Sequence, residues 1–159
     1  EEGMFIERRQ VLLELSPEDV FRAYTGIGGE RGWLYLNWAW AMRGWMDKAI
    51  GGVGLRRGRR HPDEVHAGEA LDFWRVEIVE KNIKMRLLAE MKVPGKAWLE
   101  FESQKQENNK TLLIVTAYFA PHGLSGFLYW YTMWPFHAFI FDGLTRRLAS
   151  RARVLGHAY

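Results

Sequence analysis

Apolar and polar residues alternate along the middle of the chain, and this pattern predicts an antiparallel sheet. Within residues 83–91, Met85 and Leu87 fall on one face, whereas Lys84 and Arg86 fall on the other. The other predicted strands cover residues 4–15, 69–80, 96–104 and 110–120. Short turn signals separate the last four strands, and strands joined by tight turns pair as antiparallel neighbours.

Three helices are predicted around these strands. The first begins where Ser16 can cap the helix and Pro17 takes the first helical position. The second covers residues 33–52, because apolar residues recur there on one helical face until Gly51 and Gly52 end it. The third follows the last strand and reaches Gly156, with Pro135 as a point where it is expected to kink.

The start of the third helix is unusual, because residues 124–141 contain no Asp, Glu, Lys or Arg. Eighteen apolar residues are about the minimum for crossing a bilayer. However, the Trp and Tyr residues lie through the middle of the run, and so do Pro135 and His137, whereas spanning helices carry aromatic belts at both ends. We therefore expect residues 123–144 to form a buried helix that covers the sheet, without stable membrane insertion. Peripheral membrane contact is the alternative.

The composition indicates one domain over residues 1–159, with a core from 4 to 155. Aromatic residues make up 14% of the chain, which favours a large core, an apolar pocket or an interface. There is no cysteine, so disulfides and thiolate chemistry are excluded, and a cytoplasmic location is expected. The charged N-terminus, EEGMFIERRQ, does not resemble a secretory signal.

Charge and motif patterns exclude several kinds of partner. The net charge is +3, and the arginines of residues 56–60 are expected to be largely exposed to solvent rather than to bind phosphates. No nucleic-acid motif accompanies them, so no nucleic-acid partner is predicted. The acidic and histidine residues of 61–69 lack a metal-ligand spacing. The glycine-rich stretches 25–32 and 51–58 fail the dinucleotide fingerprint, so neither a metal nor a cofactor is predicted.

The order of strand, two helices, antiparallel meander and long helix resembles the START-like, or helix-grip (SRPBCC), superfamily, which includes the birch-pollen-allergen-like proteins. Four stretches, LDFWRVEIVE, RLLAEMKVPGKAWLEFE, FAPHGLSGFLYWY and PFHAFIFDGL, are similar to one uncharacterised family within it. Members of that family occur alone or C-terminal to an NAD(P)-binding short-chain-dehydrogenase-like module. The resemblance covers residues 11–153, and the lack of Met at position 1 fits a domain excised from such a fusion.

This resemblance implies an α+β helix-grip fold, in which a curved antiparallel sheet wraps around a long C-terminal helix and two short helices follow the first strand. It also implies a cavity for an apolar or amphipathic small molecule. It carries over no catalytic residues.

Aromatic residues at helical and strand spacing are the candidate cavity lining. Residues 131, 134, 137 and 141 recur every three or four positions and should face one way. The predicted ligand-binding residues are Trp38, Met42, Trp45, Trp74, Tyr131, Trp134, His137 and Phe141. They are expected to converge on one pocket between the sheet and the last helix. Packing in the core or in a dimer interface is the competing interpretation.

Three functions follow from these patterns and from the family resemblance, which alone supplies the reductase partner. The first is a binding module for an apolar or aromatic small molecule, accessory to a fused or separate NAD(P)-dependent reductase. The second is an enzyme that uses the same cavity for acid–base chemistry, with His137 and Asp72 as the leading pair. The third is a homodimeric scaffold whose aromatic residues form the interface. The first is the preferred function; it and the second require a cavity, whereas the third requires a filled interior.

Overall fold

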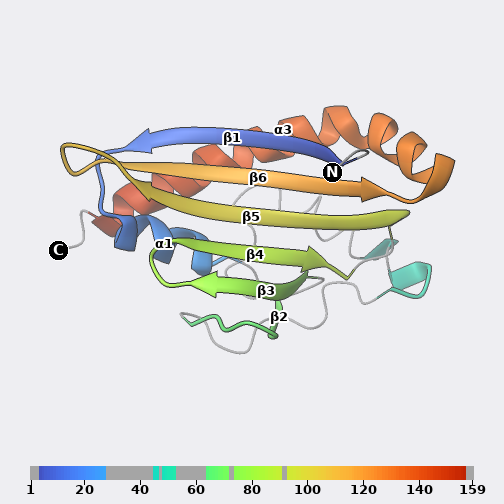
Figure 1. The fold of residues 1–159 in the computed structure, drawn as a ribbon, viewed down its shortest axis with the longest axis horizontal. Coiled ribbons are helices and arrows are strands. Elements are labelled where there is room, and N and C mark those ends of the chain that lie inside the picture. The colour runs from blue at the N-terminus through green and yellow to red at the C-terminus, as the bar shows by residue number, and fades with distance from the viewer. Residues whose placement is uncertain are drawn as a thin grey trace.

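The computed structural model describes residues 4–27, 45–46, 48–52, 64–71, 74–90 and 93–156, without the side chains of residues 136, 137, 140 and 141. The described strands form one antiparallel six-stranded sheet in the order β1-β6-β5-β4-β3-β2 (Figure 1). Their bounds are β1 Phe5–Leu13, β2 Ala70–Leu71, β3 Trp74–Glu80, β4 Lys84–Ala89, β5 Gly95–Lys105 and β6 Thr111–Pro121. The predicted α+β fold with a curved antiparallel sheet is confirmed.

The turns between these strands lie where the sequence placed them. Asn82 and Asn109 both adopt a positive φ, and asparagine tolerates this left-handed conformation better than other non-glycine residues. The β3–β4 and β5–β6 turns are therefore short, and the strands on either side of each turn pair directly. Strand β1 comes from the other end of the chain and pairs with β6 along its whole length, from Phe5 opposite Phe119 to Leu13 opposite Thr111.

Helix α1 (Pro17–Thr25) begins as its sequence predicts. The Ser16 hydroxyl accepts a hydrogen bond from the backbone N–H of Asp19 at 3.2 Å, and Pro17 occupies the first turn. The helix packs against the sheet through Tyr24, whose ring stacks on that of Phe101 at 5.6 Å. Of the second predicted helix, over 33–52, only residues 45–46 and 48–49 are described as helical, and residues 28–44 lie outside the described part of the chain.

Helix α3 (Gly123–Gly156) is the long C-terminal helix, and it continues through Pro135. It packs against α1, β1 and β6, and Figure 1 shows it running along the sheet beside β1. Its second half buries Leu144, Leu148 and Ala152 in the core. Among the described residues, no helix is long and apolar enough to cross a membrane. The expectation of a buried helix over 123–144 needs a correction, because only one side of this segment is buried.

The outer face of the sheet carries paired charges. The Arg86 Nε donates to the Glu100 carboxylate at 2.8 Å, and this hydrogen bond raises the pKa of Arg86. The Arg75 Nε donates to Glu90 at 3.0 Å. The arginines at 56–60 lie outside the described residues, so their predicted exposure stays a prediction.

Tyr24 offers a test of the main core. Its buried hydroxyl oxygen accepts a hydrogen bond from the Ser103 hydroxyl at 3.0 Å, and burial raises its pKa, so the phenol stays protonated. Tyr24→Phe leaves the Ser103 hydroxyl without this partner and should lower the free energy of unfolding by about 1 kcal/mol. Urea unfolding measures this loss, with the exposed Tyr131→Phe as the control. Equal midpoints for Tyr24→Phe and wild type would contradict the role of this bond.

Candidate functional site

The inner face of β1 carries two charged residues. Successive residues of a strand point to opposite faces, and Phe5, Glu7, Arg9, Val11 and Leu13 are the less exposed set. Glu7 pairs with Ala117 and Arg9 pairs with Val115, both buried residues of β6. Because α3 packs on β1 and β6, these charged side chains lie between the sheet and the helix. Charged groups in such a position need either partners or a function.

An aromatic cluster borders these charges at the N-terminal end of β1. The ring of Trp130 stacks on Phe5 at 4.9 Å and on Phe119 at 5.7 Å. Phe127 and Tyr131 meet the same Phe5 ring edge-on, each at 5.7 Å. Helix α3 and strands β1 and β6 therefore build a rigid apolar wall between the sheet and the helix.

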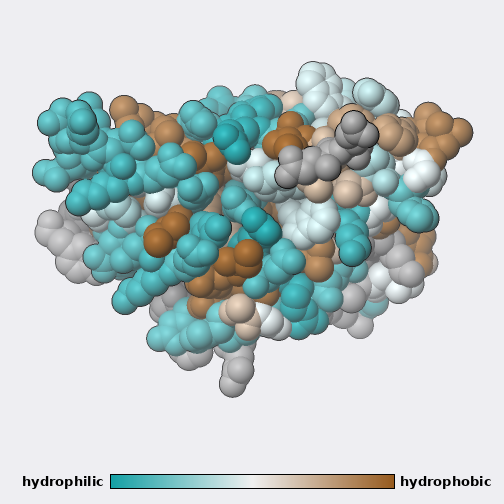
Figure 2. Space-filling view, in the orientation of Figure 1, coloured by the Kyte–Doolittle hydropathy of each residue, from teal (hydrophilic) through white to brown (hydrophobic). Residues whose placement is uncertain are grey.

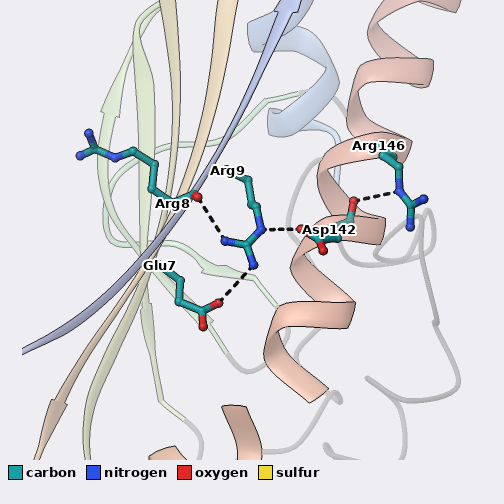
Figure 3. A network of polar contacts seen from close by, with 5 residues as sticks. All are labelled: Glu7, Arg8, Arg9, Asp142 and Arg146. Atoms are coloured by element: carbon teal, nitrogen blue, oxygen red, sulfur yellow. Dashed lines mark hydrogen bonds and ion pairs between the residues drawn. The ribbon is translucent and has the colours of Figure 1, made fainter. Parts of the chain in front are cut away.

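An ion-pair network centred on Arg9 connects β1 with α3 (Figure 3). The Arg9 Nε donates to the Asp142 carboxylate, and its Nη1 donates to the Arg8 carbonyl oxygen at 3.2 Å. The Arg146 Nε donates to the backbone carbonyl oxygen of Asp142 at 3.3 Å. Figure 3 shows Glu7 and Arg9 extending from β1 towards α3, whereas Arg8 points away. Arg9 thus joins the edge strand to the middle of α3.

Glu7 is the least satisfied charged group of this region. Its side chain is 9% exposed, and its Oε2 has no hydrogen-bond partner, with the Arg9 Nη2 3.8 Å away. Burial raises the pKa of Glu7 above its ordinary value of 4.5. The Arg9 charge and a hydrogen bond with Trp134 oppose this rise, whereas Asp142 adds to it. A carboxyl group in this state can accept a hydrogen bond or exchange a proton with a bound molecule.

A groove of about 330 Å³ opens between β1 and α3 beside Arg9. The residues that line it are Arg9, Gln10, Val11, Asp142, Thr145 and Arg146. Arg9, Asp142 and Arg146 give the groove charged walls, although more of its surface is apolar than polar, so it suits a molecule with both polar and apolar parts.

The described residues provide no obvious metal site. Within them, no group of three His, Asp or Glu side chains gathers closely enough to hold an ion. Of the acidic and histidine residues at 61–69, Glu64, His66 and Glu69 are described, and His66 and Glu69 pair with each other at 3.3 Å.

The predicted lining residues occupy different environments. Trp134 reaches the site, where its side chain lies close enough to Glu7 to lower the pKa of this carboxyl group. Tyr131 touches Phe5 but is mostly exposed, and Trp45 is exposed as well. Trp74 is buried in β3, and three strands separate β3 from β1. The other predicted site residues lie outside the described part of the chain. These are Trp38, Met42 and Asp72 as a whole, and the side chains of His137 and Phe141.

The structure brings forward four residues that the sequence analysis did not select: Glu7, Arg9, Trp130 and Asp142. A signal for the first two was present, because Glu7 and Arg9 share the strand parity of Phe5, Val11 and Leu13. Two charges on the apolar face of an otherwise amphipathic strand indicate a polar site inside the fold. Trp130 precedes Trp134 by one helical turn, so both belong to one helix face.

A family model matches most of the chain in sequence. It covers residues 2–144, and the family is described as "Protein of unknown function (DUF2867)". No curated protein matches the sequence.

Solved structures of similar fold have little sequence in common with the chain. Norcoclaurine synthase from Thalictrum flavum is 7% identical, with a TM-score of 0.59 over 98% of this chain and 88% of that one. Zhui aromatase/cyclase from Streptomyces sp. R1128 is 11% identical, with a TM-score of 0.56 over 94% of each chain. At such identities the likeness shows the fold alone, which is of the helix-grip type.

Proposed function

The chain belongs to the family described as "Protein of unknown function (DUF2867)", and we propose that it is a binding module for an apolar or aromatic small molecule. The proposed site lies between β1 and α3. Its apolar part is the wall of Phe5, Phe119 and Trp130, its polar anchor is Glu7, and its open end is the groove beside Arg9.

The state of Glu7 is the observation that carries this proposal. A buried carboxyl oxygen without a hydrogen-bond partner costs about 1–3 kcal/mol, so native folds rarely keep one without a use. A ligand that offers an N–H or O–H group to Glu7 would remove this cost, and its apolar part would lie against the neighbouring rings. The half-exposed indole of Trp134 lies beside this carboxyl group, so it is available to contact a ligand bound there.

An acid–base enzyme is the second candidate, and it rests on the raised pKa of Glu7. A carboxyl group whose pKa lies closer to neutrality transfers protons more effectively at physiological pH. In this case Glu7 would take over the role that the sequence analysis gave to His137 and Asp72. Mass spectrometry of ligands retained by wild type and by Glu7→Gln separates the two functions. A binder would retain the same molecule in both proteins, in a smaller amount in the variant that lacks the carboxylate anchor, whereas an enzyme would retain an unconverted substrate only in the variant.

Probe binding tests the site directly. The neutral dye N-phenyl-1-naphthylamine combines flat rings with one N–H donor. We expect one dye per chain to bind the native protein and to quench Trp fluorescence. Trp134→Ala should weaken this binding about tenfold, which corresponds to about 1.4 kcal/mol. Fluorescence titration measures both constants.

The control is Trp45→Ala, which removes an exposed indole from another part of the chain and should leave the affinity unchanged. If the dye binds only in urea concentrations that begin to unfold the protein, the aromatic residues are packing elements. In that case the binding proposal fails, and the scaffold hypothesis replaces it.

The partner of such a module is a further part of the proposal. We propose that the ligand is passed to or from an NAD(P)-dependent reductase, because the resemblance stated above includes members joined to such a module. The proposal for the site does not depend on this partner.

A further inference from the structure

Helix α3 exposes large apolar side chains along its first half. Leu124 is 75% exposed, Leu128 60%, Tyr131 67% and Phe139 57%. We call these four residues the α3 stripe. Figure 2 shows apolar surface at the end of the molecule where α3 begins. Monomeric proteins normally place polar residues at such positions, so this face requires an explanation.

The stripe lies on the exposed side of α3, with Tyr131 at its margin, where its ring also contacts Phe5 of β1. With 100° per residue, Leu124, Leu128, Tyr131 and Phe139 fall within one arc, whereas Trp130, Leu144 and Leu148 fall on the far side. The same exposed arc carries Asp142, Arg146 and Arg153 further along the helix. The second half of α3 therefore has the ordinary polar outer face, and the first half has an apolar one in its place.

The spacing within the stripe is that of a helix–helix seam. Leu124, Leu128 and Tyr131 are separated by four and three residues, and Pro135 and Ala138 continue the same alternation. This alternation gives an average period of 3.5 residues, which lets one helix pack along another. The seam covers about four turns before the charged residues begin.

The size of the stripe agrees with a protein interface. A large apolar side chain offers about 200 Å². At the exposures given above, the four residues present roughly 500 Å². The largest apolar patch on a typical monomer is about 300–600 Å² and is often functional, and a standard interface buries about 800 Å² per partner.

We propose that the α3 stripe is a homodimer interface, in which α3 of one chain packs against α3 of a second copy. An isologous contact buries the same apolar face on both chains. Charge favours this occupant over a lipid surface. Asp142 is the one charged residue within 123–144, whereas helices that lie on membranes carry Lys and Arg beside their apolar face. Homodimer interfaces, in contrast, are depleted of charge at their centre.

The mass of the protein in solution tests this proposal. Sedimentation equilibrium at about 1–100 μM should give twice the mass of one chain at the upper concentrations, since a contact of this size has an affinity in the micromolar range or better. Leu128→Glu should return the mass to that of one chain, because a pair of buried carboxylates would face each other across the axis. Val154→Glu is the matched control: Val154 is exposed on the same helix but outside the stripe, and the dimer should persist.

Cross-linking gives an independent readout, because the chain contains no cysteine. We expect an interchain disulfide upon oxidation in at least one of three single variants: Leu124→Cys, Leu128→Cys and Tyr131→Cys. Val154→Cys should form none. A wild type that is monomeric at about 100 μM overturns the proposal. Vesicle binding would also overturn it: if wild type stays monomeric and binds anionic vesicles, and Leu128→Glu abolishes this binding, the stripe contacts lipid. Dye binding at Glu7 should be unaffected by Leu128→Glu, so the dimer and the binding site can fail separately.

Discussion

Trp130→Ala is expected to lower the free energy of unfolding by about 3–5 kcal/mol, the usual cost of removing a large aromatic side chain from a packed site. The indole is buried and lies between the rings of Phe5 and Phe119, so its removal leaves a cavity lined by β1, β6 and α3. A loss of this size is a large share of the about 5–15 kcal/mol that stabilises a typical domain. Guanidinium unfolding followed by far-UV circular dichroism measures it.

Two variants give this measurement its scale. Trp45→Ala removes an exposed indole and should change the free energy of unfolding by no more than about 0.5 kcal/mol. Trp130→Phe keeps a stacking ring and should lose less than Trp130→Ala. If Trp130→Ala is as mild as Trp45→Ala, the aromatic wall does not hold α3 to the sheet, and the site next to it loses its apolar side.

Glu7→Gln should raise the melting temperature at pH 7 by roughly 2–4 °C, which corresponds to about 1 kcal/mol for a chain of this length. Burial raises the pKa of Glu7, so folding favours the protonated carboxyl, and its ionisation at neutral pH opposes folding. Glutamine has nearly the same shape and carries no charge, so it copies the favoured form. The variant would therefore trade a ligand anchor for stability, as binding and catalytic sites often do.

The sign of the effect depends on pH. In wild type, the stability that comes from protonated Glu7 is fully present below the ordinary pKa of 4.5 and is lost as the pH rises through the raised value in the fold. The difference between Glu7→Gln and wild type should thus be largest at pH 7–8 and shrink towards zero near pH 4. Glu14→Gln, at a well-exposed position, should show no such trend. A lower melting temperature for Glu7→Gln at pH 7 would mean that Arg9 holds the carboxylate favourably.

The sheet could be predicted from sequence because its signals are local. Asn82 and Asn109 allow tight turns, and alternation fixes which residues of β4 face inward, as with Met85 and Leu87. The start of α1 was equally clear, since Ser16 and Pro17 together define a helix N-terminus. In each case the decisive physical interaction lies within a few residues of the signal.

The face of α3 could not be predicted in the same way. Amphipathicity identifies the buried side of a helix by contrast with polar residues, and residues 124–141 contain no charged residue to supply that contrast. Tyr131 and Trp130 differ by 100° around the helix, and the structure buries Trp130. Phe5 contacts both rings, and Trp130 also stacks on Phe119; the two phenylalanines come from distant parts of the chain. Contacts of this kind leave no local pattern in the sequence.

The pairing of β1 with β6 has a consequence for how the chain folds. The two strands are roughly a hundred residues apart in sequence, and they match along nine residue pairs. Such distant contacts form only after a large loss of chain entropy, so proteins that depend on them fold slowly. During synthesis, β1 leaves the ribosome long before β6. Until β6 is available, the apolar side chains of Phe5, Val11 and Leu13 have no strand to pack against. A chaperone that shields the first strand until β6 emerges would act at the step where this fold is most open to aggregation.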